Sequence, residues 1–155
     1  MNYEEFIASF FLFFIDFFIF LTMRLKTVNL TLGLQIFKAF GDESRIRILN
    51  LLLHYEEMCI SDLEQILDFT QTKTSRHLLY LKHCGLLSSK KEDQWTYYFI
   101  KEEYVGIISQ FFTILEEKDV QLNEDRKMYY TLYTNNILAI RKLHNQQRKY
   151  RLPEL

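Results

Sequence analysis

Residues 61–87 read SDLEQILDFTQTKTSRHLLYLKHCGLL, and this stretch decides the fold. Ser61 and Glu64 form a Ser-x-x-Glu pattern, which predicts a capping box that opens a helix. After a short turn, a second helix is expected from Gln71 to Gly85, because glycine commonly follows the last helical residue. Two helices joined by such a tight turn predict a helix-turn-helix.

The two faces of the second helix differ in chemistry. Thr74, Leu78 and Leu81 recur at helical spacing and predict its buried face. Residues 70–91 carry five lysines and arginines and no carboxylate, in a chain whose net charge is only −1. A basic stretch on a nearly neutral protein indicates either a phosphate-binding surface or a solvated face.

The segments on either side complete a winged helix. Residues 87–92 and 95–100 flank a polar Asp93-Gln94 turn, and residues 95–100 alternate with period two, which predicts a basic β-hairpin. Upstream, helical spacing predicts a helix over residues 32–40, and Asp42 is a suitable N-cap for another that reaches about His54. The expected fold class is mainly α with a small β-hairpin: a dimeric winged helix-turn-helix with extra N- and C-terminal helices.

Two further helices are expected, over residues 104–118 and 126–150. Each carries an apolar stripe at helical spacing. The stripes are Val105, Ile108, Phe112 and Leu115 on the first helix, and Tyr129, Tyr133, Ile137 and Ile140 on the second. These helices carry more aromatic surface than one small domain can bury, which predicts a partner. A twofold homodimer is the commonest arrangement.

The first 25 residues have a different composition. Residues 6–23 include eight phenylalanines and are long enough for a marginal membrane span, although Asp16 opposes insertion. Three interpretations stay open: a membrane anchor, an extra helix packed in a dimer, or an upstream extension that is not native, with Met23 as the start. The expected division is residues 1–25 as this apolar segment, 26–118 as the DNA-binding domain and 119–155 as a C-terminal extension for dimer contact.

Four quoted stretches carry a resemblance to a known family. They are FKAFGDESRIRILNLL (37–52), MCISDLEQIL (58–67), TQTKTSRHLLYLKHCGLL (70–87) and KKEDQWTYYFI (90–100). In order and spacing the chain resembles ArsR/SmtB-type regulators over about residues 29–118. The resemblance implies a homodimer that places two recognition helices in successive major grooves of double-stranded DNA, with the wings against the backbone.

The recognition helix and the wing supply the candidate DNA contacts. Gln71 has the donor and acceptor pattern for adenine, and Arg76 or Lys73 the donors for guanine. The remaining candidates are base or phosphate contacts on the helix and phosphate contacts on the wing. They are Thr72, Ser75 and His77 on the helix and Lys90 and Lys91 on the wing. His77 has the alternative of a solvated helix residue.

A sensor site is incomplete in this sequence. Many ArsR-type proteins bind soft metals through a Cys-x-Cys pair, and here Cys59 matches the first position while Ser61 replaces the second. A soft metal needs about three thiolates, so neither a metal nor another cofactor is expected. Cys59 stays a candidate sensor thiol because a helix N-terminus lowers a thiol pKa. Cys84 is expected to be a small buried hydrophobe.

The sequence therefore predicts a sequence-specific transcriptional regulator, with repression taken from the resemblance. No enzyme is expected, because the chain has no phosphate-binding loop, nucleophile elbow or paired metal-binding histidines. The alternative is a winged helix that binds proteins or is tethered to a membrane, without specific DNA binding. The expected location is cytoplasmic or, through residues 6–23, anchored in the inner membrane with the DNA-binding domain in the cytoplasm.

Overall fold

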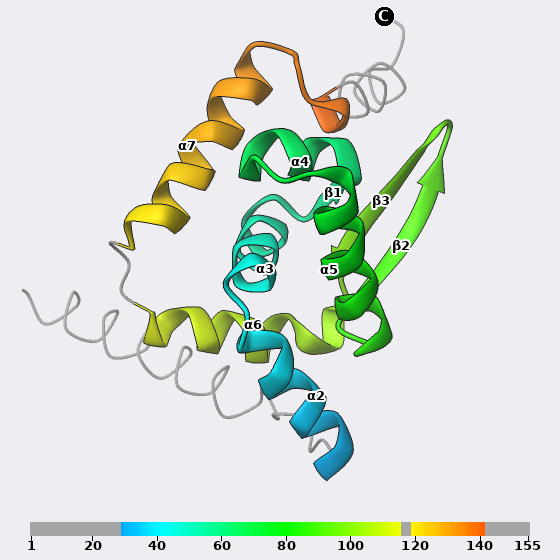
Figure 1. The fold of residues 1–155 in the computed structure, drawn as a ribbon, viewed down its shortest axis with the longest axis vertical. Helices are drawn as coiled ribbons and strands as arrows, with labels where there is room; N and C mark the ends of the chain where they lie inside the picture. Colours follow the sequence, from blue (N-terminus) through cyan, green and yellow to red (C-terminus); the bar gives the residue numbers. More distant parts are fainter. Residues whose placement is uncertain (1–28, 116–118, 142–155) are drawn as a thin grey trace, which may run out of the picture.

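The computed structural model of the 155-residue chain describes residues 29–115 and 119–141. The elements in chain order are α2 (Leu30–Phe40), α3 (Glu43–Tyr55), β1 (Glu57–Cys59), α4 (Ile60–Leu67), α5 (Gln71–His83), β2 (Leu87–Glu92), β3 (Trp95–Ile100), α6 (Glu102–Ile114) and α7 (Val120–Thr134). Figure 1 shows α3 at the centre, with α5 and the β2–β3 hairpin on one side and α7 on the other. This arrangement confirms the mainly helical winged helix-turn-helix.

Helix ends follow the expected chemistry at two predicted positions. The Asp42 side chain accepts a hydrogen bond from the backbone N–H of Arg45 (3.1 Å) at the start of α3. Gly85 follows α5 with φ +79°, a left-handed conformation that costs glycine no side-chain clash. Both predictions are confirmed.

The predicted capping box at Ser61 and Glu64 is wrong. Helix α4 begins two residues earlier than a Ser61 cap requires, at Ile60, so Ser61 lies in its first turn and Cys59 occupies the N-cap. The reason is a strand that the sequence pattern did not predict. Residues Glu57–Cys59 pair antiparallel with β3, which keeps the backbone extended up to Cys59.

The sheet has three strands in the order β1-β3-β2, all antiparallel. The predicted hairpin of β2 and β3 is confirmed at its expected bounds, with Lys90 opposite Tyr97. Strand β1 has three residues, too few to show a period of two. The sheet is therefore larger than the expected hairpin by one short strand.

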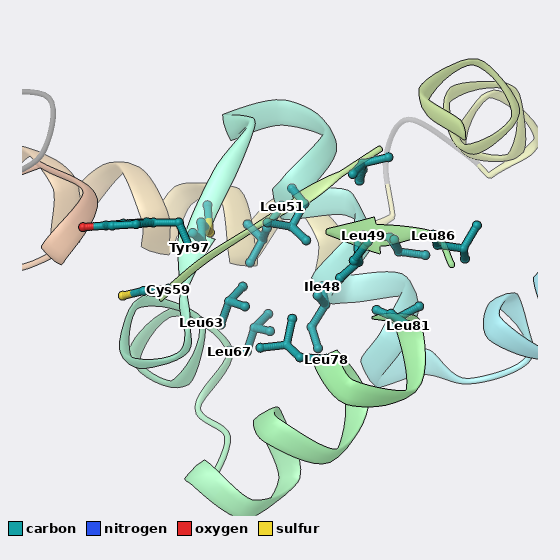
Figure 2. Close-up of a cluster of buried hydrophobic side chains, with 14 of the residues drawn as sticks. Ile48, Leu49, Leu51, Cys59, Leu63, Leu67, Leu78, Leu81, Leu86 and Tyr97 are labelled. Carbon is teal, nitrogen blue, oxygen red and sulfur yellow. The ribbon is translucent and has the colours of Figure 1, made fainter. Parts of the chain in front are cut away.

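The core lies where α3 meets α4, α5 and the sheet. Figure 2 shows the side chains of these elements converging. The members that have no exposed surface include Ile48, Leu49 and Leu51 from α3, Leu63 from α4, and Leu78 and Leu81 from α5. Thr74 is also fully buried, which confirms the predicted inner face of α5.

The C-terminal part differs from the long helix expected over residues 126–150. Helix α7 begins earlier and ends at Thr134, and Asn136 then adopts a left-handed φ of +59°. Asparagine tolerates this conformation better than most residues. A new helical segment starts at Ala139, so Tyr129 and Ile140 do not share one helix. The helix predicted over 104–118 likewise ends early, at Ile114.

The apolar stretch at residues 6–23 lies outside the described residues. Within residues 29–115 and 119–141, none of the helices combines the length and apolar character that a membrane span requires. The three interpretations of the first 25 residues therefore stay predictions.

Candidate nucleic-acid interface

The turn between α4 and α5 is fixed by local hydrogen bonds. Asp68 ends α4 in a left-handed conformation (φ +55°), and its N–H donates to the Glu64 carbonyl. Thr70 caps α5 by accepting from the N–H of Lys73 (3.3 Å), and the Thr74 hydroxyl donates back to the Thr70 carbonyl (3.1 Å). Because four orphan donors open every helix, this cap fixes where α5 begins.

Arg47 ties this turn to the rest of the molecule. Its Nη2 donates to the Leu67 carbonyl (3.3 Å) at the end of α4, and its Nε and Nη2 donate to the Asp125 carboxylate on α7 (2.8 and 2.7 Å). Its guanidinium also lies 5.0 Å from the Phe69 ring centre. Sequence reasoning missed this role, because the partner lies 78 residues away and no local pattern marks it.

Arg45 orients the recognition helix from the other side. Its Nε and Nη2 donate to the carbonyls of Ala39 (2.9 Å) and Lys38 (2.7 Å) at the end of α2. Its guanidinium lies over the Tyr80 ring of α5 at 4.2 Å. Two arginines of α3 therefore contact the helix-turn-helix, Arg47 at the turn and Arg45 at Tyr80 of α5.

The N-terminal half of α5 presents a polar, basic face to solvent. Gln71, Thr72, Ser75 and Arg76 are exposed, and the structure brings them together on one turn and a half of helix. Lys73 is partly buried, with Nζ 3.6 Å from the Phe69 ring centre. Among the residues the structure describes, no carboxylate forms an ion pair with Arg76, so its donors face outward unpaired.

His77 does not belong to this face. Its side chain is only 8% exposed and its Nδ1 lies 3.7 Å from Asp42 on α3. Burial lowers the pKa of His77, and the carboxylate of Asp42 opposes that effect only in part. The candidate DNA contact at His77 is therefore corrected to a packing residue, because α5 turns it toward α3.

The two wing lysines differ in how free they are to contact a DNA phosphate. The Lys90 Nζ contacts Glu57 (2.7 Å) and Glu92 (3.0 Å). Burial opposes its charged form, but the hydrogen bonds to these two carboxylates outweigh burial and raise the pKa of Lys90. Two carboxylates already neutralise Lys90, which weakens its candidacy as a phosphate contact. Lys91 is exposed on the same strand and keeps its candidacy.

The candidate sensor thiol is in an unsuitable environment. Cys59 is 1% exposed, and its Sγ lies 3.1 Å from the Ser61 hydroxyl. Burial raises the pKa of Cys59 to about 11, and the nearby Asp62 carboxylate adds to this. The expected lowering of its pKa is therefore wrong, because desolvation exceeds any effect of the helix N-terminus. Cys84 is buried, as predicted.

No described group of three or more His, Cys, Asp or Glu side chains is arranged to hold a metal ion. Cys59 has Ser61 and Asp62 as its polar neighbours, and neither supplies a second thiolate. The expectation that no metal or cofactor binds stays a prediction.

Sequence comparison places the core of this chain among known regulators. The family described as "Bacterial regulatory protein, arsR family" matches residues 42–89. The cadmium resistance transcriptional regulatory protein CadC of Listeria innocua is 42% identical over 65 residues, which are 42% of this chain and 55% of that protein. The arsenical resistance operon repressor of Bacillus subtilis is 35% identical over 77 residues, 49% of this chain and 73% of the repressor. The match thus spans little more than half the length of CadC.

A solved structure has a similar fold. It is the homodimeric winged helix-turn-helix DNA-binding domain Mb0332 of Mycobacterium bovis, described as a possible ArsR-family transcriptional regulator. The TM-score is 0.53 at 25% identity, and the match covers 57% of this chain and 82% of that domain.

Proposed function

Since the chain belongs to the ArsR family of bacterial regulatory proteins, we propose that it binds duplex DNA sequence-specifically as a homodimer and represses transcription. The observation that carries the proposal is the exposed face formed by Gln71, Thr72, Ser75 and Arg76 at the start of α5. The winged-helix proteins reported above include a named repressor and a homodimeric DNA-binding domain, and both support it.

The geometry suits reading of the major groove. The groove admits one α-helix, whose N-terminal residues reach the base edges. Arg76 has the planar donors to bind O6 and N7 of guanine, and Gln71 has the amide to bind N6 and N7 of adenine. Lys91 on the wing contacts the phosphate backbone, which fixes orientation without specifying sequence. Because its partner is DNA, the domain acts in the cytoplasm.

Replacing Arg76 by Ala should weaken binding to the chain's own promoter by about tenfold to a hundredfold. A bidentate base contact is worth about 1–3 kcal/mol, and each 1.4 kcal/mol is about tenfold. Fluorescence anisotropy on promoter DNA and scrambled DNA at two salt concentrations measures this, because phosphate contacts make binding salt-dependent. Lys127→Ala is the charge-matched control, since Lys127 is exposed on α7.

Equal, weak binding of both DNAs by the unsubstituted chain would contradict the proposal. That result would favour the alternative of a protein-interaction or membrane-tethered module. The family is one of regulators, and the absence of enzyme activity stays a prediction for this chain.

The surface shared by α2 and α6 is the candidate dimer interface. Four large apolar side chains lie exposed on it: Leu30 (80%), Leu34 (51%), Phe37 (77%) and Ile114 (80%). Two of them, Phe37 and Ile114, line a hollow of about 210 Å³ together with Phe40 and Phe111. The Phe40 and Phe111 rings stack at 4.1 Å between centres, which holds α2 against α6. A second copy of this face buries these side chains in a closed twofold dimer.

Phe37→Glu should convert the dimer to a folded monomer at micromolar concentration. A charge placed in the apolar centre of an interface must lose its hydration in both subunits. We therefore expect the dissociation constant of the dimer to rise at least about a hundredfold. Analytical ultracentrifugation measures the mass, and circular dichroism checks the fold. The matched control is Gln35→Glu, which adds the same charge at an exposed position of α2. A Phe37→Glu protein that stays dimeric would place the interface elsewhere.

A further inference from the structure

A pocket of about 480 Å³ lies between α3, α6 and α7, away from the DNA-reading face. Figure 1 shows α6 and α7 flanking α3, the three elements that line it. The lining residues are Asn50, Leu53 and His54 from α3, Ser109, Phe112, Thr113 and Leu115 from α6 and its C-cap, and Leu122 and Arg126 from α7. Its volume falls within the range of about 300–1,000 Å³ found for small-molecule sites.

Arg126 brings a positive charge to this pocket. Its Nη1 donates to Nε2 of His54 (2.9 Å), and its Nη2 donates to the Asn123 side chain. Arginine cannot accept, so His54 Nε2 is the acceptor and the imidazole proton lies on Nδ1, which donates to the Asn50 carbonyl (2.8 Å). Within the described ranges Arg126 forms no ion pair with a carboxylate, and its guanidinium keeps further N–H donors.

Asn50 lines the same pocket, and its unpaired side-chain donor is buried behind the lining surface. The residue is 2% exposed, and its side-chain Nδ2 has no hydrogen-bond partner among the described residues. Buried amide donors are nearly always paired, because an unpaired one costs free energy. The described residues that line the pocket include no Asp or Glu, so none of them offsets the charge of Arg126.

Ser109 and Thr113 add two hydroxyl groups, and the remaining side chains of the lining are apolar. Leu53, Phe112, Leu115 and Leu122 come from three sides and offer aliphatic and aromatic surface. A ligand that satisfies both parts has an anionic acceptor at one end and an apolar body at the other. A phosphate matches only the charged part of the lining, and a metal cation matches neither part.

We propose that this pocket binds a small organic carboxylate. Its carboxylate accepts hydrogen bonds from the Arg126 guanidinium, and its apolar body packs on Phe112 and Leu122. The carboxylate supplies Arg126 with a counter-charge, which no carboxylate of the described residues provides.

A short series of contacts connects the pocket to the helix-turn-helix. Asp125, the neighbour of Arg126 in α7, binds Arg47, and Arg47 binds the carbonyl of Leu67 at the end of α4. A ligand that draws Arg126 inward moves Asp125 with it, and through Arg47 it biases the turn that positions α5. This regulatory part rests on the proposed function, since it requires DNA binding to be the output.

Isothermal titration of the full chain with phenylacetate and octanoate tests the pocket. At least one of them should bind saturably, and 2-phenylethanol, the neutral analogue of phenylacetate, should bind at least about tenfold more weakly. Arg126→Gln should weaken carboxylate binding by at least about tenfold, whereas Lys127→Gln on the same helix should not. Thr113→Trp, at an exposed lining position, should also reduce binding because the indole fills the pocket without changing a charge.

Two results would overturn the proposal that this pocket binds a carboxylate. One is no saturable binding of either carboxylate, and the other is unchanged binding in folded Arg126→Gln and Thr113→Trp proteins. Repeating the promoter titration with the bound carboxylate present tests the regulatory part. If a carboxylate binds to the protein but leaves its affinity for DNA unchanged, the proposed coupling is wrong and the proposed binding site still stands. If the protein does not bind promoter DNA at all, the proposed function is wrong. The calorimetric result then still decides whether the pocket binds a carboxylate.

Discussion

Asp125→Ala should lower the free energy of unfolding by about 3–5 kcal/mol, the cost of removing one partner from a buried ion pair. The Arg47 and Asp125 side chains are 13% and 3% exposed, and two hydrogen bonds of 2.7 and 2.8 Å join them. The hydrogen bonds that Arg47 donates to Asp125 raise the pKa of Arg47. Without that partner the guanidinium still stays charged, because arginine is not deprotonated in proteins. An unpaired charge would then remain beneath α7. Urea unfolding followed by circular dichroism measures the loss.

Glu124→Ala is the matched control for this prediction, because Glu124 is the exposed neighbour of Asp125 in α7. It should change stability by less than about 0.5 kcal/mol. The double variant Arg47→Met with Asp125→Leu should recover most of the loss, since an apolar pair of similar size can replace a buried ion pair. If Asp125→Ala were as stable as Glu124→Ala, α7 would not be docked on α3 through this pair.

Asp62→Ala should detach the segment that follows α7. Asp62 has no exposed surface, and its carboxylate accepts hydrogen bonds from the backbone N–H groups of Ala139 (2.7 Å) and Ile140 (3.0 Å). Burial raises the pKa of Asp62, while these two hydrogen bonds act in the opposite direction. Alanine leaves both buried donors without a partner, at about 1–3 kcal/mol each. Urea unfolding measures the total.

Hydrogen exchange locates the effect of this substitution. The amides of Ala139 and Ile140 should exchange much faster in Asp62→Ala, because local opening no longer breaks their hydrogen bonds to the carboxylate. Gln65→Ala, at an exposed position of the same helix, should leave both amides protected. Unchanged exchange at Ala139 and Ile140 in the Asp62→Ala protein would show that Leu138 and Ile140 hold the segment by burial alone.

Much of the winged helix could be predicted from the sequence because its signals are local. The N-cap at Asp42 and the glycine after α5 act within one turn of helix, and the buried stripe of Thr74, Leu78 and Leu81 follows from the helical period. The strands of the hairpin are six residues each and are joined by a short polar turn that the sequence shows. Local hydrogen bonds and periodic burial leave a trace in neighbouring residues.

The candidate site was predicted only in part. Gln71, Thr72, Ser75 and Arg76 share an exposed face because they lie within six consecutive helical positions. His77 lies one position further along and is turned toward Asp42. Helical spacing locates a face to within about one residue, since successive side chains are about 100° apart. The packing of α3 against α5 decides whether a residue at the edge of the exposed face, such as His77, is buried or exposed.

The sequence by itself determined the helix-turn-helix, the wing and the basic composition of the recognition helix. Tertiary structure alone decided the contacts that span the chain: Arg47 with Asp125, Asp62 with Ala139, and β1 with β3. It also decided that Cys59 is a buried thiol whose pKa is raised. These features depend on desolvation and on partners about 40 to 80 residues away. Such partners leave no periodic pattern, because an ion pair or a remote helix cap needs only one residue at each end.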